Sequence, residues 1–80
     1  MTKKEFSREA FSKRLYDLRV DHDKKQKDIA NLLFRERSAY TRYENQGAEP
    51  SITSLFLLAN YYNISIDYLV CRTDNPKPYE

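Results

Sequence analysis

An 80-residue chain with 40% apolar residues, 32% charged residues and a net charge of +2 is long enough for one small domain with a modest core. Its single cysteine, Cys71, excludes an intramolecular disulfide and a cysteine-based metal cluster. The N-terminus is charged, and no apolar stretch approaches the roughly 20 residues of a membrane span, so we expect no signal peptide and a place in the reducing cytoplasm.

The apolar periodicity predicts helices along most of the chain. Ser7 is suited to cap the first helix, which is predicted to end near position 20. Phe6 and Phe11 have the spacing of a hydrophobic staple across the start of this helix. Phe11, Leu15 and Leu18 then repeat at the spacing of one apolar helix face.

Two short helices are predicted after the charged loop Asp21–Lys25, one over about residues 26–33 and the other over about 37–45. Only about three residues separate these two helices. Helices joined so closely usually cross steeply, which is the helix-turn-helix arrangement.

The rest of the chain is predicted to contain two more helices and a polar end. Gln46–Pro50 holds the only glycine and a proline and is predicted to be a loop. Ser51 is suited to cap a fourth helix, and Ser65 a short fifth one. The predicted organisation is an N-terminal extension leading into the first helix (1–10), a helix-turn-helix domain (11–71) and a polar, proline-containing tail or linker start (72–80).

Basic residues concentrate in the middle of the chain. Residues 24–43 carry six basic and two acidic side chains, a net charge of +4. Residues 1–23 carry six basic and five acidic side chains (+1), and residues 44–80 carry two and five (−3). A basic block of this kind is typical of nucleic-acid binding, although charge alone does not distinguish it from a solvated basic face.

An ordered series of motifs runs through roughly residues 11–74. It comprises Gln26-Lys-Asp-Ile-Ala30 with Leu33, Arg37-Ser-Ala-Tyr-Thr-Arg-Tyr-Glu44-Asn45, Pro50-Ser51, Leu55, Leu58-Ala59, Ile64-Ser65-Ile66-Asp67-Tyr68-Leu69 and Arg72-Thr73-Asp74. This series resembles the Xre/Cro-like, or lambda-repressor-like, helix-turn-helix family. The resemblance implies an all-α, five-helix bundle in which the second helix crosses the DNA backbone and the third enters the major groove.

The resemblance also implies a function. We expect a transcriptional regulator of bacterial or phage type that binds double-stranded DNA sequence-specifically, as a repressor that occupies a pseudo-palindromic operator as a homodimer. The alternative is an antitoxin or adaptor that uses the same fold to bind a protein partner. We expect no enzyme, cofactor or metal site, because there is no glycine-rich phosphate loop or metal-ligand spacing and His22 lies in a charged loop.

Four residues of the predicted third helix are candidates to read bases. Arg37 and Ser38 lie at its start, and Thr41 and Arg42 lie four positions later, on the same face. An arginine can donate two hydrogen bonds to guanine O6 and N7, a contact worth about 1–3 kcal/mol of discrimination. The alternative is that these residues are ordinary solvent-facing polar side chains.

A second group of residues is predicted to contact the DNA backbone. Gln26 resembles the family's glutamine, which binds a phosphate at a helix N-terminus and braces the recognition helix. Asn45 resembles a loop residue that contacts phosphate, or is a plain helix C-cap, and Tyr43 is expected to pack inward. The full predicted set is Lys24, Lys25, Gln26, Arg35, Tyr40 and Asn45.

Two further roles are implied by the resemblance. Arg19 and Glu44 match a family pair that joins the first helix to the third, and breaking such a partly buried pair is strongly destabilising. The family often dimerises through the fifth helix and the residues after it, which here places Tyr68, Val70 and Cys71 on the expected dimer surface.

The turn between the second and third helices departs from the family pattern. Phe34 replaces the usual glycine, Arg35 replaces a small buried apolar residue, and Glu36 replaces the usual Ser/Thr cap. A bulky residue in a left-handed conformation costs about 1–2 kcal/mol, so we expect the turn to be rebuilt, with Phe34 taking over the core contact. Asp23 and Cys71 also stand where glycine is common, and Lys25 replaces the Thr cap of the second helix.

Overall fold

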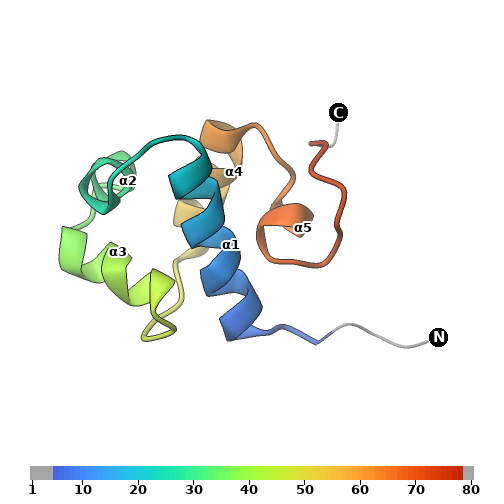
Figure 1. The fold of residues 1–80 in the computed structure, drawn as a ribbon, viewed down its shortest axis with the longest axis horizontal. Coiled ribbons are helices and arrows are strands. Elements are labelled where there is room, and N and C mark those ends of the chain that lie inside the picture. Colours follow the sequence, from blue (N-terminus) through green and yellow to red (C-terminus); the bar gives the residue numbers. More distant parts are fainter. Residues whose placement is uncertain (1–4, 79–80) are drawn as a thin grey trace.

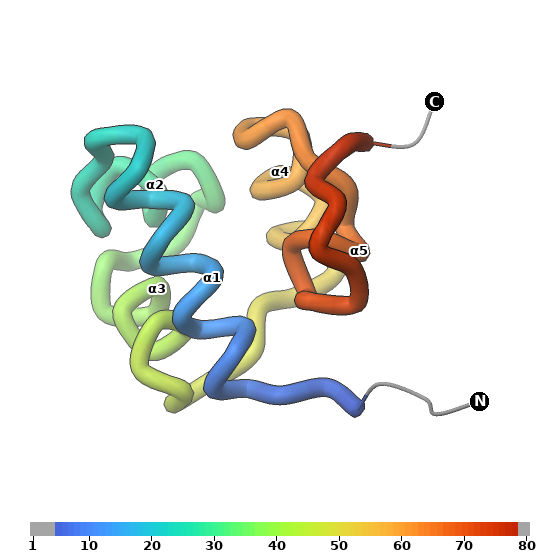
Figure 2. Tube along the Cα trace, turned by 45° about the vertical axis from the view of Figure 1, so that its right-hand side comes forward, coloured from blue at the N-terminus to red at the C-terminus, as the bar shows by residue number. Residues whose placement is uncertain are grey.

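The computed structural model describes residues 5–78, which fold into helices without a strand. The helices are α1 (Arg8–Asp21), α2 (Gln26–Leu32), α3 (Arg37–Glu44), α4 (Ile52–Tyr62) and α5 (Ile66–Leu69). Figure 1 shows α2 and α3 on one side of the central α1 and α5 on the other, and the turned view of Figure 2 places α4 on the same side as α5. The predicted all-α, five-helix architecture is confirmed, and none of the helices in the described part of the chain is long and apolar enough to span a bilayer.

Serine caps define the starts of three helices, as predicted. The hydroxyls of Ser7, Ser51 and Ser65 each accept a hydrogen bond from the backbone N–H three residues later, at 3.0–3.1 Å. The rings of Phe6 and Phe11 lie 5.8 Å apart between centroids, so the predicted staple is present at the start of α1.

At the end of each of the five helices lies a residue other than glycine whose backbone is in the left-handed conformation, with positive φ. The N–H after each of these residues donates to the carbonyl five positions earlier, for example Arg35 N–H to Ala30 O at 2.9 Å, which is the Schellman arrangement. The left-handed residues are Asp23, Phe34, Gln46, Asn63 and Cys71, with φ of 55°, 57°, 69°, 54° and 68°. The chain's one glycine, Gly47, occupies none of these positions.

Every helix contributes a fully buried side chain to the core. The largest of these are Phe11, Leu15, Ile29, Tyr40, Leu58 and Leu69. The segment after α5 folds back on the bundle, because the Ser65 N–H donates to the Pro76 carbonyl at 3.1 Å. Figure 2 shows this segment running alongside α4 and α5, away from α2 and α3.

The turn between α2 and α3 is not rebuilt, which corrects our expectation. Phe34 has φ 57° and an 88% exposed side chain, so it makes no core contact. The reason is that the end of α2 fixes the backbone, since the N–H groups of Phe34 and Arg35 donate to Asn31 and Ala30. The preceding Leu33 is buried and fills the core position, and α3 begins at Arg37 as predicted.

Candidate nucleic-acid interface

Helix α3 presents one apolar and one polar face because of the spacing of its tyrosines. Tyr40 and Tyr43 are three residues apart and buried, and their rings meet edge to face with centroids 6.0 Å apart. The side chains of Arg37, Ser38 and Arg42 are exposed. The polar face of α3 is therefore free to meet a ligand, while its tyrosines anchor the helix to the core.

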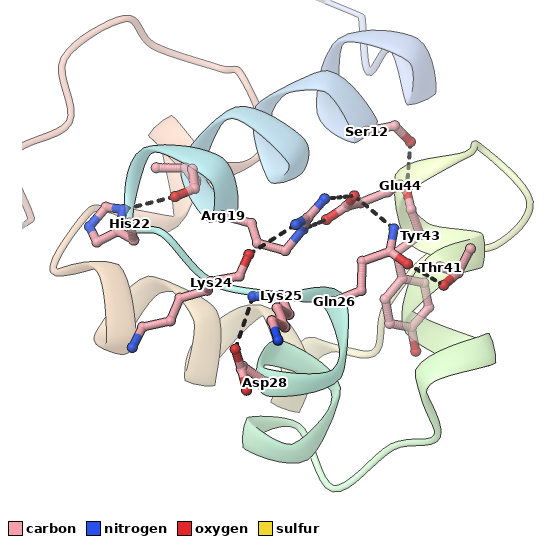
Figure 3. A network of polar contacts seen from close by, with 11 residues as sticks. Ser12, Arg19, His22, Lys24, Lys25, Gln26, Asp28, Thr41, Tyr43 and Glu44 are labelled. Carbon is pink, nitrogen blue, oxygen red and sulfur yellow. Dashed lines mark hydrogen bonds and ion pairs between the residues drawn. The ribbon is translucent and has the colours of Figure 1, made fainter.

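An ion pair fixes α3 against α1 (Figure 3). The Arg19 guanidinium donates to both oxygens of Glu44, Nε to Oε2 at 2.7 Å and Nη2 to Oε1 at 3.0 Å. Its Nη1 also donates to the Lys24 carbonyl at 2.9 Å. The side chains of Arg19 and Glu44 are only 12% and 5% exposed. The structure thus contains the pair named from the sequence, which connects α1, the following loop and α3.

A second link between α1 and α3 was missed by the sequence reasoning. The buried Ser12 hydroxyl donates to the Tyr43 carbonyl at 2.6 Å. Together with Arg19, Ser12 holds the C-terminal half of α3 at two points along α1. A serine on the apolar side of a predicted helix, one residue after Phe11, was the available signal.

Gln26 fastens the start of α2 to α3. Its Nε2 donates to Glu44 Oε1 at 3.1 Å, and its Oε1 accepts from the Thr41 hydroxyl at 2.7 Å. Figure 3 shows these contacts beside the Arg19–Glu44 pair. The predicted bracing of the third helix by Gln26 is present, and the Thr41 hydroxyl proton is committed to this contact.

The Glu44 carboxylate is stabilised in its charged form. Its partial burial favours the neutral acid, but the polar groups around the carboxylate, Arg19 foremost, outweigh burial and hold the pKa of Glu44 below its usual value. The same Glu44 contact raises the pKa of Arg19. The network is therefore charged on both sides at neutral pH.

The predicted contact between the Tyr40 side chain and the DNA backbone is wrong. Tyr40 has no exposed surface, and its hydroxyl has no hydrogen-bond partner among the described residues. This burial raises the pKa of Tyr40 well above its usual value. Helical spacing could have indicated this burial, because Tyr40 lies three residues before Tyr43, which faces the core.

An open depression lies beside the start of α2, on the side that faces α3. It has a volume of about 520 Å³ and is lined by Arg19, Lys25, Gln26, Lys27 and Arg37. Four of these five residues are cationic, and three of them, Lys25, Lys27 and Arg37, are not used in the Arg19–Glu44 pair, so the depression favours an anionic group. Lys27 was absent from the predicted set, although it belongs to the same basic block.

Other predicted DNA contacts lie around this depression or at the opposite end of α3. Lys24 and Arg35 are exposed, in the loop before α2 and the turn after it. At the C-terminal end, Arg42 donates to the Gly47 carbonyl at 3.2 Å, and Asn45 is the C-cap whose Oδ1 accepts from the Gly47 N–H at 3.0 Å. Both of these exposed side chains order the loop after α3.

The predicted dimer surface is only partly available. The Tyr68 ring packs under the Arg14 guanidinium, 3.8 Å from its carbon to the ring centroid, so this aromatic face is used within the chain. Val70 and Cys71 are half-buried. Val70 also lines an apolar pocket of about 270 Å³ together with Phe6 and Leu55.

The described residues contain no cluster of three or more histidine, cysteine, aspartate or glutamate side chains that could hold a metal ion. His22 instead ends α1, with its Nδ1 2.8 Å from the Leu18 carbonyl and its ring 4.8 Å from the Tyr62 ring.

Comparisons with known proteins agree with this geometry. A helix-turn-helix family model matches residues 15–69. The chain is 32% identical over 68 residues to the "Uncharacterized HTH-type transcriptional regulator YobD" of Bacillus subtilis (strain 168), covering 85% of this chain and 61% of that protein. It is 33% identical over 64 residues to the "Cryptic phage CTXphi transcriptional repressor RstR" of Vibrio cholerae, covering 80% of this chain and 58% of the repressor.

A solved structure shows the same likeness. The crystal structure of a transcriptional regulator from Listeria innocua superposes with a TM-score of 0.75 at 34% identity, over 76% of this chain and 57% of that one. The chain spans about three fifths of the length of these relatives. From the family match and the helix geometry, the chain belongs to the Xre/lambda-repressor-like helix-turn-helix family.

Proposed function

We propose that this chain binds double-stranded DNA as the reading domain of a transcriptional regulator. In this proposal α3 lies in the major groove and α2 crosses the backbone. The observation that carries it is the cationic depression at the start of α2, beside the exposed polar face of α3. The relatives named as transcriptional regulators, one of them a phage repressor, support the same function.

The depression suits a backbone phosphate. Lys25 and Lys27 supply charge there, and Gln26 is held in place by Glu44 and Thr41. Phosphate contacts of this kind supply affinity without sequence information. Lys24, Arg35 and Asn45 add further backbone contacts along the same surface.

Base reading falls mainly to the start of α3. Arg37 is exposed in the first turn and free to approach a guanine edge, with Ser38 beside it. Arg42 takes a secondary role because it also orders the loop at Gly47. Thr41 reaches DNA through its methyl group or as an acceptor, since its proton is donated to Gln26.

The regulator acts as a homodimer on a pseudo-palindrome, with two recognition helices about 34 Å apart, one DNA turn. The dimer surface includes Val70, Cys71 and the segment after them. Bound at a promoter in the cytoplasm, the dimer represses by excluding polymerase from its operator.

Selection of duplexes from a random library by the 80-residue protein tests this proposal, followed by salt titration of the winning duplex. We expect an enriched palindrome, and an affinity that falls steeply as salt rises because counterions are released from the phosphates. Lys25→Ala should reduce the salt slope by about 1. Lys77→Ala, which removes the same charge from the tail, is the matched control and should leave it unchanged.

Absence of any enriched sequence would contradict the DNA-reading proposal and favour a protein-binding role for the fold. A single enriched half-site would retain DNA reading and contradict the homodimer.

A further inference from the structure

Phe34 occupies a backbone conformation that suits its side chain poorly. A left-handed φ is uncommon outside glycine, is found most often at Asn or Asp among other residues, and is a clear outlier for a bulky side chain. Phe34 is the only aromatic among the five left-handed helix-end residues of the described chain. Its φ of 57° is fixed by the Schellman hydrogen bonds that end α2.

Packing does not compensate for this conformation. The Phe34 side chain is 88% exposed, the largest exposed fraction of any large apolar residue in the described range. Leu33 already fills the core position, so a glycine at 34 would serve the fold better than phenylalanine. Backbone strain that is not offset by packing is found most often at functional sites.

The surroundings of Phe34 indicate what the ring contacts. Arg35 is adjacent in sequence, and Arg37 begins α3 three residues later; both side chains are exposed. Neither forms a side-chain hydrogen bond or ion pair with another residue between 5 and 78. An exposed apolar ring on the turn that carries Arg35 and leads to Arg37 matches a ligand that offers anionic groups and C–H surface side by side.

Double-stranded DNA has this chemistry, with phosphates beside deoxyribose carbons and thymine methyl groups. We propose that Phe34 contacts DNA: its ring packs on apolar C–H surface at the edge of the site read by α3, while Arg35 binds the neighbouring phosphate. This inference rests on the proposed DNA-reading function. It adds to that function an apolar contact from the turn, where the family has glycine.

Stability and binding are expected to change in opposite directions when the ring is removed. In Phe34→Gly the left-handed strain is relieved, and the melting temperature should rise by about 4 °C. Its affinity for the duplex selected by the wild-type protein should fall about five- to tenfold, because the apolar contact is lost. Phe34→Tyr keeps the ring and should bind within about twofold of wild type.

Asn63→Gly is the matched control, since Asn63 holds the same left-handed position at the end of α4. It should leave the affinity unchanged. The salt dependence gives an independent readout: Phe34→Gly should keep the wild-type slope, whereas Arg35→Ala should reduce it by about 1.

Deoxyuridine substitutions in the selected duplex distinguish the two apolar surfaces. If the ring contacts a thymine methyl, one dT→dU change weakens wild-type binding and leaves Phe34→Gly unaffected; if it contacts deoxyribose, no single change does so. The contact itself is tested by the affinity loss in Phe34→Gly, and the deoxyuridine series then assigns it to a thymine methyl or to deoxyribose. Equal affinity of wild type and Phe34→Gly, with the wild type still enriching a duplex, overturns the inference alone, whereas failure of the wild type to enrich any duplex removes the proposed function as well.

Discussion

Glu44 connects the elements that orient the candidate reading helix. Its carboxylate accepts hydrogen bonds from Arg19 on α1 and Gln26 on α2, while the residue itself lies at the end of α3. Each oxygen therefore has a donor, which offsets the loss of water on burial. Glu44 therefore joins α1, α2 and α3 through one side chain.

Removing the partner of Glu44 should be costly because a nearly buried carboxylate would lose its charged donor. We expect Arg19→Ala to lower the free energy of unfolding by about 3 kcal/mol, measured by urea denaturation. Lys13→Ala breaks the exposed pair with Asp17 and should leave the urea midpoint almost unchanged. Similar midpoints for the two variants would contradict the role assigned to the Arg19–Glu44 pair.

The same carboxylate predicts a dependence of stability on acid. Because the pKa of Glu44 is lower in the folded protein than its ordinary value of about 4.5, its stabilisation is fully present above that pH and is lost as the pH falls through the folded-state pKa. Glu44→Gln should therefore lose less stability than wild type between pH 5 and pH 3, as followed by thermal unfolding across about this range. Parallel pH profiles for the two proteins would show that Glu44 does not carry the effect.

At the scale of elements, the five helices share one way of ending. Each closes with a Schellman turn whose left-handed residue has a side chain, so the chain does not use glycine where glycine is most favourable. Gly47 follows Gln46, and an added Cβ on Gly47 would lie 2.9 Å from Asn45 Oδ1. Close approach of the Asn45 side chain, rather than a positive φ, accounts for glycine at this position.

Gln46 offers a test of these helix ends away from Phe34. Its carbonyl accepts from Arg8, a backbone contact that glycine would keep. Gln46→Gly should raise the free energy of unfolding by about 0.5–1 kcal/mol, and Gln46→Val should lower it, because a β-branched residue tolerates the left-handed region poorly. Thermal melts of both variants check this, and the opposite order would mean that the loop after α3 relaxes out of the Schellman form.

At the scale of the whole molecule, the helix boundaries and the all-α, five-helix architecture could be predicted from the sequence. Serine caps and helical spacing are local signals, and the structure preserves them at Ser7, Ser51 and Ser65. The burial of Tyr40 and the exposure of Phe34 could not be predicted from such local signals. Which side of an eight-residue helix is buried depends on its neighbours, and the turn at Phe34 follows the backbone hydrogen bonds of α2 rather than the preference of its side chain.

In the candidate interface, too, the sequence indicated some of the residues, and others are brought in by tertiary packing. The basic block indicated the region of the candidate interface, and the structure brings Lys25, Gln26 and Arg37 around one depression there. Lys27 joins them because the start of α2 packs beside α3, a tertiary relation that spacing along the chain does not show. The opposite side of α1, formed by α4 and α5, carries none of the residues proposed to read bases (Figure 1).

We propose that Arg37, at the start of α3, reads a base pair. The most direct test compares wild type and Arg37→Ala on two duplexes: the selected one, and one in which a guanine of each half-site is replaced. We predict that wild type prefers the selected duplex by about tenfold or more at one such position, and that Arg37→Ala binds both duplexes equally. Unchanged discrimination in Arg37→Ala at every position would contradict the claim.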